Sequence, residues 1–343
     1  DNLKLRSYDG EKRAAGLSEQ SCWSEVSTTQ LSPAIGYSLS AACPAGVAMA
    51  IVRMPIGTMS EVNSTPVTAW GVDDNETWAN CGWNYVANPY LVALGNACVR
   101  YLTIPSLDMQ DYEQLTVAEA EVRPLNTFFV QTGSTQPLLL ARPQQTIDYP
   151  TEQPSGDVVV DARIIIEGNG RTDRTYLLFA SDYTDNPDFD AHLPKLFGLA
   201  PKIYTIYDDV NFASLALPDE KLDAAIPLGV RIDNAATYTF ALNHEQSTLQ
   251  GVTRIELIDF EDNEVVDLTT SDYAVVLPAG EITERFALRA GFFRAGQYGD
   301  LLAGGGNGGK QFVRAPRAVQ MHFDQTDFFA LRAHIVNDFL RNV

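Results

Sequence analysis

The sequence is poor in histidine and lacks the short motifs that mark common catalytic sites. None of its four histidines stands in an H-E-x-x-H pattern, and no G-x-S-x-G occurs. Residues 304–311 resemble a phosphate loop, but Gln311 replaces the Ser or Thr that holds magnesium, so a glycine-rich linker is the better interpretation. The 44 acidic residues leave a glycosidase-type carboxylate pair open, although no local pattern marks one. The sequence thus favours a chain without catalytic activity. The histidines are His192, His244, His322 and His334.

Positive charge is also scarce. The 343 residues include 24 Lys and Arg against 44 Asp and Glu, which gives a formal net charge of −20 at pH 7. A surface of this sign repels a phosphate backbone, so a nucleic-acid partner is excluded. The same charge favours solubility and an exposed surface of the extracellular type.

No apolar run is long enough to cross a bilayer as a helix. The longest candidate, residues 42–53, is too short and contains Pro44. The chain begins at Asp1 rather than Met, and we expect a processed protein or a fragment from which any signal peptide has gone. No transmembrane segment is therefore predicted.

Cysteine is rare and confined to the first hundred residues. No C-x-x-C pair occurs, which argues against a zinc ribbon or a thioredoxin-like site. An even number in one region predicts two disulfides in an exported domain, and four buried thiols are the alternative. Three pairings are open, of which the sequential one closes the shortest loops. The residues are Cys22, Cys43, Cys81 and Cys98.

The pattern that is present is that of short strands separated by turns. Runs rich in β-branched and aromatic residues predict strands in the first half at 35–41, 47–54, 67–72, 100–104 and 126–133. Residues 112–122 could form the one short helix or lead into a strand. The second half predicts strands at 157–168, 174–180, 227–232, 236–243, 253–262, 264–268, 273–277 and 284–290.

Two turns in the second half predict β-hairpins. Gly168-Asn169-Gly170 joins the first two strands of that half, and Asp262-Asn263 lies at the centre of residues 258–268. Strands at this spacing predict an all-β protein with two antiparallel β-sandwich domains, jelly-roll or immunoglobulin-like, plus a C-terminal tail. The expected divisions are residues 1–145, a Pro-rich linker at 146–156, residues 157–292, and a glycine-rich joint and tail at 293–343.

An acidic segment at 181–195 offers candidate metal ligands. Its carboxylates are the hard oxygen donors that calcium prefers, but their spacing does not match an EF-hand. The alternative is a solvated loop between strands. No other cofactor is indicated. The candidate ligands are Asp182, Asp185, Asp188 and Asp190.

Residues 80–94, NCGWNYVANPYLVAL, concentrate turn and aromatic residues. Gly82-Trp83-Asn84 predicts the start of a strand that carries a core tryptophan, and Asn88-Pro89 predicts the turn that ends it. The segment therefore reads as a strand and a corner. Because Trp23, Trp70 and Trp78 are also present, stacking on sugars is an alternative role for the tryptophans.

The same segment carries a resemblance. GWNYVANPYLVAL is similar to the G-W-N-hydrophobic-x-G-N-P-Y segment of large exported surface proteins of the Bacteroidetes, with Ala87 in place of the usual Gly. Residues 31–39 and 123–133 resemble the segments that precede and follow it there. Residues 188–290 resemble that family's K-L-F-G, Y-T and E-R-F-x-L stretches, with Pro194 as a departure. The resemblance spans about residues 30–290 and leaves the tail unmatched.

The resemblance implies where the protein is located, and it implies no catalytic reaction. It implies β-sandwich architecture and export to the cell surface or the medium, of the kind associated with type IX secretion. The last residues, 328–343, look like the start of a sorting domain. We therefore expect a non-catalytic, adhesin-like or structural module whose partners are surface or secretion proteins, or glycans. The alternatives are a glycan-binding module and an accessory region of a larger secreted enzyme.

Overall fold

The protein is described by a computed structural model. It describes residues 3–27, 31–41, 63–72, 78–106, 109–143, 145, 156, 159–186 and 188–291. Cys43, Gln311 and the strand predicted at 47–54 lie outside these residues, as do the predicted tail and almost all of the predicted linker. All described residues belong to one compact unit, Asp1–Phe293.

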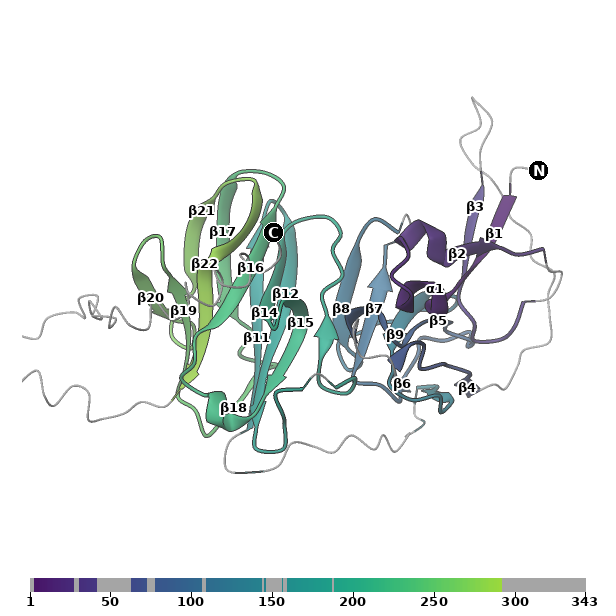
Figure 1. Ribbon diagram of the computed structural model, residues 1–343, viewed down its shortest axis with the longest axis horizontal. Helices are drawn as coiled ribbons and strands as arrows, with labels where there is room; N and C mark the ends of the chain where they lie inside the picture. The colour runs from purple at the N-terminus through teal and green to yellow at the C-terminus, as the bar shows by residue number, and fades with distance from the viewer. Residues whose placement is uncertain are drawn as a thin grey trace, which may run out of the picture. The chain divides into compact units, whose positions relative to one another are not determined.

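The first half is built from short strands with little helix. Its helices are α1 (Gly10–Ala14) and the 3-10 turns η1 (Glu19–Cys22) and η3 (Trp78–Asn80). Its strands are β1 (Leu3–Tyr8), β2 (Trp23–Glu25), β3 (Tyr37–Ala41), β4 (Ser64–Thr65), β5 (Trp83–Ala87), β6 (Asn96–Ala97), β7 (Tyr101–Pro105), β8 (Tyr112–Thr116), β9 (Thr127–Gln131) and β10 (Leu138–Ala141). They form sheets in the orders β2-β1-β3, β4-β10-β6 and β5-β9-β7-β8 (Figure 1).

The second half is one 12-stranded sheet. Its strands are β11 (Val159–Gly168), β12 (Arg171–Ala180), β13 (Leu193–Pro194), β14 (Lys202–Tyr207), β15 (Val210–Leu217), β16 (Ile226–Ile232), β17 (Ala236–Leu242), β18 (Thr248–Gln250), β19 (Arg254–Asp259), β20 (Glu264–Asp267), β21 (Tyr273–Leu277) and β22 (Gly280–Gly291), with the 3-10 turn η4 at Asp219–Lys221. The main order is β20-β19-β22-β16-β14-β15-β12-β11-β17-β21 (Figure 1). Strand β13 pairs with β15, and β18 pairs with β11.

The pairing confirms the all-β class. Within the described residues, every pairing of named strands is antiparallel except that of β12 with β15, which is parallel. Both predicted hairpins form: β11 pairs with β12 from Val159↔Ala180 to Gly168↔Arg171, and β19 pairs with β20 from Glu256↔Asp267 to Asp259↔Glu264. The division into two sandwich domains stays a prediction.

Of the two alternatives left open for residues 112–122 the strand forms, and the strand predicted at 67–72 is wrong. Residues 112–116 form strand β8, paired with β7, and residues 117–122 are turn and coil rather than helix. The reason is tertiary, because Leu115 is buried only when β8 lies on the sheet. Residues 67–72 form no strand, because Asn84 holds the backbone of Thr68 from both sides with side-chain hydrogen bonds.

Several strands are buried on both faces, which arranges the core in layers. In β5 and β9, Trp83, Tyr85 and Phe129 belong to one buried cluster, whereas Val86 and Val130 belong to another. Such two-sided burial explains why these strands lack a clear alternation of apolar and polar residues.

Strands β12 and β15 repeat this arrangement. Tyr176 and Leu178 join the same cluster as Trp83, which we call the aromatic layer, while Leu177 and Phe179 face the core of the 12-stranded sheet. The aromatic layer therefore lies between β5–β9 and β12–β15. It fixes the two halves of the chain to each other.

Candidate functional site

The Gly-Trp-Asn and Asn-Pro-Tyr segment is architectural. Trp83 is fully buried, which confirms the core position expected for it, and its indole nitrogen donates to the carbonyl of Ala79 at 2.9 Å. Gly82 has a φ of +71°, and a Cβ there would meet the carbonyl oxygen of Thr132 at 2.1 Å, so only glycine fits. Asn84 donates to the carbonyls of Thr68 and Gly82.

Asn88 stabilises the corner that follows β5 through side-chain hydrogen bonds. It is 1% exposed, and its amide donates to the carbonyls of Val92 and Val122 at 2.9 Å each, while its oxygen accepts the backbone N–H of Tyr90. The Tyr90 hydroxyl donates to the carbonyl of Leu140 at 2.5 Å. Every polar side-chain atom of these two residues is engaged, so neither is presented to a ligand.

The two predicted disulfides find no support among the described cysteines. Cys22, Cys81 and Cys98 are present as thiols, and Cys43 lies outside the described residues. The Cys22 thiol donates to the carbonyl of Ser18 at 3.5 Å, and that of Cys81 to Gly71 at 3.1 Å. Packing in separate places, rather than cross-linking, accounts for the burial of Cys22 and Cys81.

The four candidate calcium ligands do not converge on one site, and three of them have partners of their own. Asp185 accepts the Tyr207 hydroxyl and pairs with Lys221 at 3.4 Å, and Asp188 accepts the backbone N–H groups of Asp190 and Ala191. Within the described residues, no group of three or more His, Cys, Asp or Glu side chains is placed to hold a metal ion. Local closeness in sequence does not bring these carboxylates to one point.

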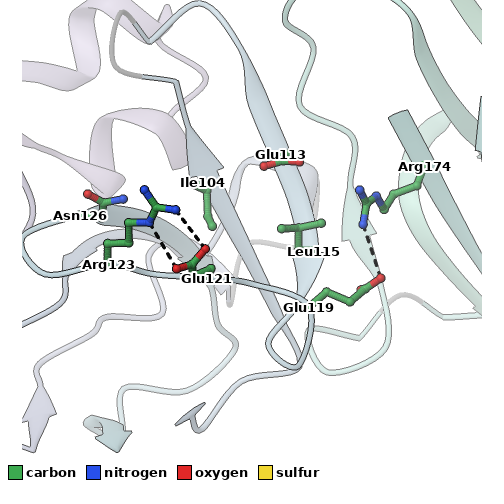
Figure 2. A pocket seen from close by; sticks show the side chains of 8 residues that line it. All are labelled: Ile104, Glu113, Leu115, Glu119, Glu121, Arg123, Asn126 and Arg174. Carbon is green, nitrogen blue, oxygen red and sulfur yellow. Dashed lines mark hydrogen bonds and ion pairs between the residues drawn. The ribbon is translucent and has the colours of Figure 1, made fainter. Parts of the chain in front are cut away.

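A pocket of about 350 Å³ opens beside strands β7 and β8 and gathers charged side chains that are scattered in the sequence (Figure 2). Its apolar side chains are Ile104 and Leu115. The polar ones are Glu113, Glu119, Glu121, Arg123, Asn126 and Arg174.

Glu119 is the centre of this pocket's electrostatics. Its carboxylate accepts the Thr116 hydroxyl at 2.6 Å and the Tyr176 hydroxyl at 2.9 Å, and it lies 3.2 Å from Arg163 and 3.5 Å from Arg174. Burial acts to raise the pKa of Glu119, but the hydrogen bonds from Thr116 and Tyr176 and the Arg163 charge outweigh it and hold that pKa below 4.5. Glu119 is therefore an ionised structural group.

The remaining acids of the pocket differ from Glu119. Glu121 pairs with Arg123 at 3.3 Å in an exposed position. The Glu113 carboxylate makes no hydrogen bond or ion pair with any described residue, and Figure 2 shows it without a bonded neighbour among the lining side chains. A hydrolytic carboxylate pair needs one acid with a raised pKa. Glu119, the most buried acid of the pocket, has a lowered pKa instead.

A second charged group lies buried between the halves of the chain. Lys195, whose side chain is 1% exposed, pairs with Asp173 at 2.6 Å, and Lys202 pairs with Asp111 at 2.7 Å. Burial lowers the pKa of Lys195, and the Asp173 carboxylate opposes this shift. Backbone partners complete the arrangement, since Lys195 also donates to the carbonyl of Arg174 and Asp173 accepts the N–H of Ile203.

Sequence reasoning missed both charged groups. The available signal was a lone charge within an apolar run, such as Arg163 in VDARIII or Lys202 before IYTIY. Which partner would meet each charge depends on strand pairing across tens of residues, and no local pattern carries that.

A larger pocket, of about 480 Å³, lies where strands β7, β9 and β10 meet the segment before β13. Its walls are mainly apolar and include Val99, Leu139 and Phe189, with Cys98 and Asp190 among its lining side chains. Burial raises the pKa of the Cys98 thiol, so at neutral pH it is a protonated wall group and not a nucleophile.

Comparisons of the chain with family models, curated proteins and solved structures find no match. No helix among the described residues has both the length and the apolar character needed to cross a membrane.

Proposed function

We propose that this chain is a non-catalytic, adhesin-like or structural module of an exported surface protein. The observation that carries the proposal is the state of Glu119, the most buried acid of the pocket in Figure 2. Four side chains hold Glu119 as an ionised group, so this acid serves as a fixed charge and not as a proton donor for hydrolysis.

The segments that resemble exported Bacteroidetes proteins support the same proposal. Trp83, Asn84 and Asn88 serve the strand and corner of β5, so the shared residues preserve a scaffold. Residues that serve the scaffold mark no reaction, which fits a module for attachment or binding. We propose export by the type IX route and two β-sandwich domains as parts of this interpretation.

Glycan stacking on tryptophan receives less support. None of the four tryptophans, at positions 23, 70, 78 and 83, is exposed. Trp78 lies against Phe189 and Phe212, and Trp23 against Tyr8 and Tyr85. Stacking sites in sugar-binding proteins require an open aromatic face, and here those faces contact other rings.

Location and activity can be tested separately. Protease added to intact cells should degrade the full chain while a cytoplasmic marker survives, and protection of the chain until lysis would contradict export.

The purified full chain should give no turnover with panels of glycosides, esters and peptides. Turnover that disappears in Glu113→Gln, with Asn126→Ala as the matched control in the same pocket, would overturn the non-catalytic assignment.

A further inference from the structure

The larger pocket combines an apolar interior with one solvent-exposed acid, Asp190, that makes no close ion pair. Among the described residues, the Asp190 carboxyl makes no hydrogen bond, and Asp190 is the only acidic side chain that lines the pocket. Burial, and then the neighbouring charge of Asp188, raise the pKa of that carboxyl above its ordinary value, and the charge of Arg100 opposes them only in part. A cationic group beside it would relieve both effects.

Arg100, the cationic side chain that lines this pocket, makes its close contacts with other residues. The Arg100 guanidinium donates to the Tyr183 hydroxyl at 3.0 Å and lies 3.6 Å from Asp161. It also stands over the ring of Tyr101. Because these contacts hold Arg100 in place, it does not serve as the close partner of Asp190.

The wall of the pocket around Phe189 is closely packed against its neighbours. A Cβ on Gly133 would meet the Phe189 ring at 2.5 Å, so the turn that follows β9 lies directly against that ring. Phe189 in turn contacts Trp78, with ring centroids 5.5 Å apart. A volume of about 480 Å³ with mainly apolar walls falls in the range of pockets that hold small organic molecules.

We propose that this pocket binds an apolar group that carries one primary amine, with the apolar part against Val99, Leu139 and Phe189 and the ammonium at Asp190. The two sources of this chemistry are a free aliphatic or aromatic amine and the N-terminal residue of a peptide. The inference goes beyond the proposed function, which requires no small-molecule site. The chain's net charge of −20 also draws cations toward it.

The test uses three phenyl-bearing probes that differ in charge: 2-phenylethylamine, 2-phenylethanol and 3-phenylpropionate. Calorimetric titration of the full chain should show the amine binding about tenfold more tightly than the alcohol, and the acid most weakly, because a charge-assisted hydrogen bond is added to the apolar contact. Asp190→Asn should abolish the preference for the amine while the alcohol binds as before. Equal affinity for all three probes, or a preference that survives Asp190→Asn, would overturn the proposal.

Two further arms locate the site and the source. In a Cys43→Ser background, 2-phenylethylamine should slow alkylation of Cys98, which lines the pocket, and should leave alkylation of the buried Cys22 unchanged. Unchanged alkylation of Cys98 at saturating amine would place binding elsewhere and contradict the inference. The tripeptide Phe-Gly-Gly then distinguishes the sources: tighter binding than the free amine assigns the pocket to a peptide N-terminus, and weaker binding assigns it to a small amine.

Discussion

Buried side-chain amides hold the corner after β5. Asn88 makes two donor bonds and one acceptor bond with the backbone of three other residues. Replacement by alanine removes all three bonds and leaves the backbone N–H of buried Tyr90 without this acceptor. Because a single buried group left unpaired costs about 1–3 kcal/mol, we expect Asn88→Ala to lower the free energy of unfolding by about 2 kcal/mol or more.

Chemical denaturation measures this effect, and Asn126→Ala is the matched control. Asn126 is exposed in the neighbouring loop, and its substitution should change the free energy of unfolding by less than about 0.5 kcal/mol. Equal effects of the two substitutions would show that Asn88 does not hold the corner.

The Glu119 carboxylate should stabilise the fold in a pH-dependent way. Glu119→Gln removes the charge that Arg163 and Arg174 approach, and charged hydrogen bonds predict a loss of about 1–3 kcal/mol at pH 7. The folded pKa lies below the unfolded value of 4.5. The contribution is therefore complete above pH 4.5 and is lost as pH falls through the folded pKa.

Denaturation of the two proteins at several pH values checks this sign. The difference between wild type and Glu119→Gln should be constant above pH 4.5 and should shrink below it. Glu113→Gln, which removes one negative charge from the same pocket, is the matched control. A difference that grows on acidification would contradict the assigned pKa shift.

At the scale of elements, the turn between β11 and β12 sets the longest hairpin register of the second half. Asn169 and Gly170 both have positive φ, at 52° and 70°, which is the conformation of a type I′ turn. Gly170→Ala forces a side chain into this region and should destabilise the protein by about 1 kcal/mol. No other atom lies within 4 Å of the added Cβ, so the effect is conformational.

Gly170→Asn is the matched control for the turn, because Asn169 makes a hydrogen bond to the Tyr238 hydroxyl and is left in place. Asparagine tolerates a positive φ better than alanine, so this variant should lose less stability than Gly170→Ala. Thermal denaturation of both variants decides the matter, and equal losses would show that backbone conformation does not set the effect.

Elements were predictable from the sequence where one face of a strand is buried. In β11, Val160, Ala162, Ile164 and Ile166 are buried and alternate with partly exposed residues, as the period of two predicts. Strands β5 and β12 were recognised from their β-branched and aromatic content, but their double-sided burial was not. Periodicity describes one chain segment, whereas the layer on its other face comes from a distant one.

The side chains of the candidate sites also come from segments that are distant in sequence, so the sequence did not predict that they meet. The pocket in Figure 2 joins side chains from Ile104 to Arg174, which only the pairing of β7 with β8 and the approach of β12 bring together. The acidic segment at 181–195 was visible because its carboxylates are neighbours in sequence. Neighbours along a turn point in different directions, and Asp185 and Asp188 consequently have different partners.

At the scale of the whole molecule, buried tyrosines should limit stability in alkali. Burial raises the pKa of Tyr101 and of Tyr112 from 10.0 to about 12. A folded pKa above the unfolded value means that the stabilisation is complete below pH 10 and is lost as pH rises from 10 toward 12. Ultraviolet titration should show these phenols ionising above pH 10, together with unfolding.

Tyr101→Phe should reduce the alkaline loss of stability, because it removes a phenol whose pKa is raised by burial. If all tyrosines of the native chain ionised together near pH 10 before any unfolding, the burial of Tyr101 would be contradicted.

The aromatic layer has a consequence for cooperativity. It is made by both halves of the chain, with Trp83 and Phe129 on one side and Tyr176 and Leu178 on the other. If either half opened alone, these side chains would lose one wall and meet water, so partial unfolding forfeits contacts that neither half can replace. Residues 3–291 should therefore melt in one transition, and a protease that nicks one half should release the other from its fold as well.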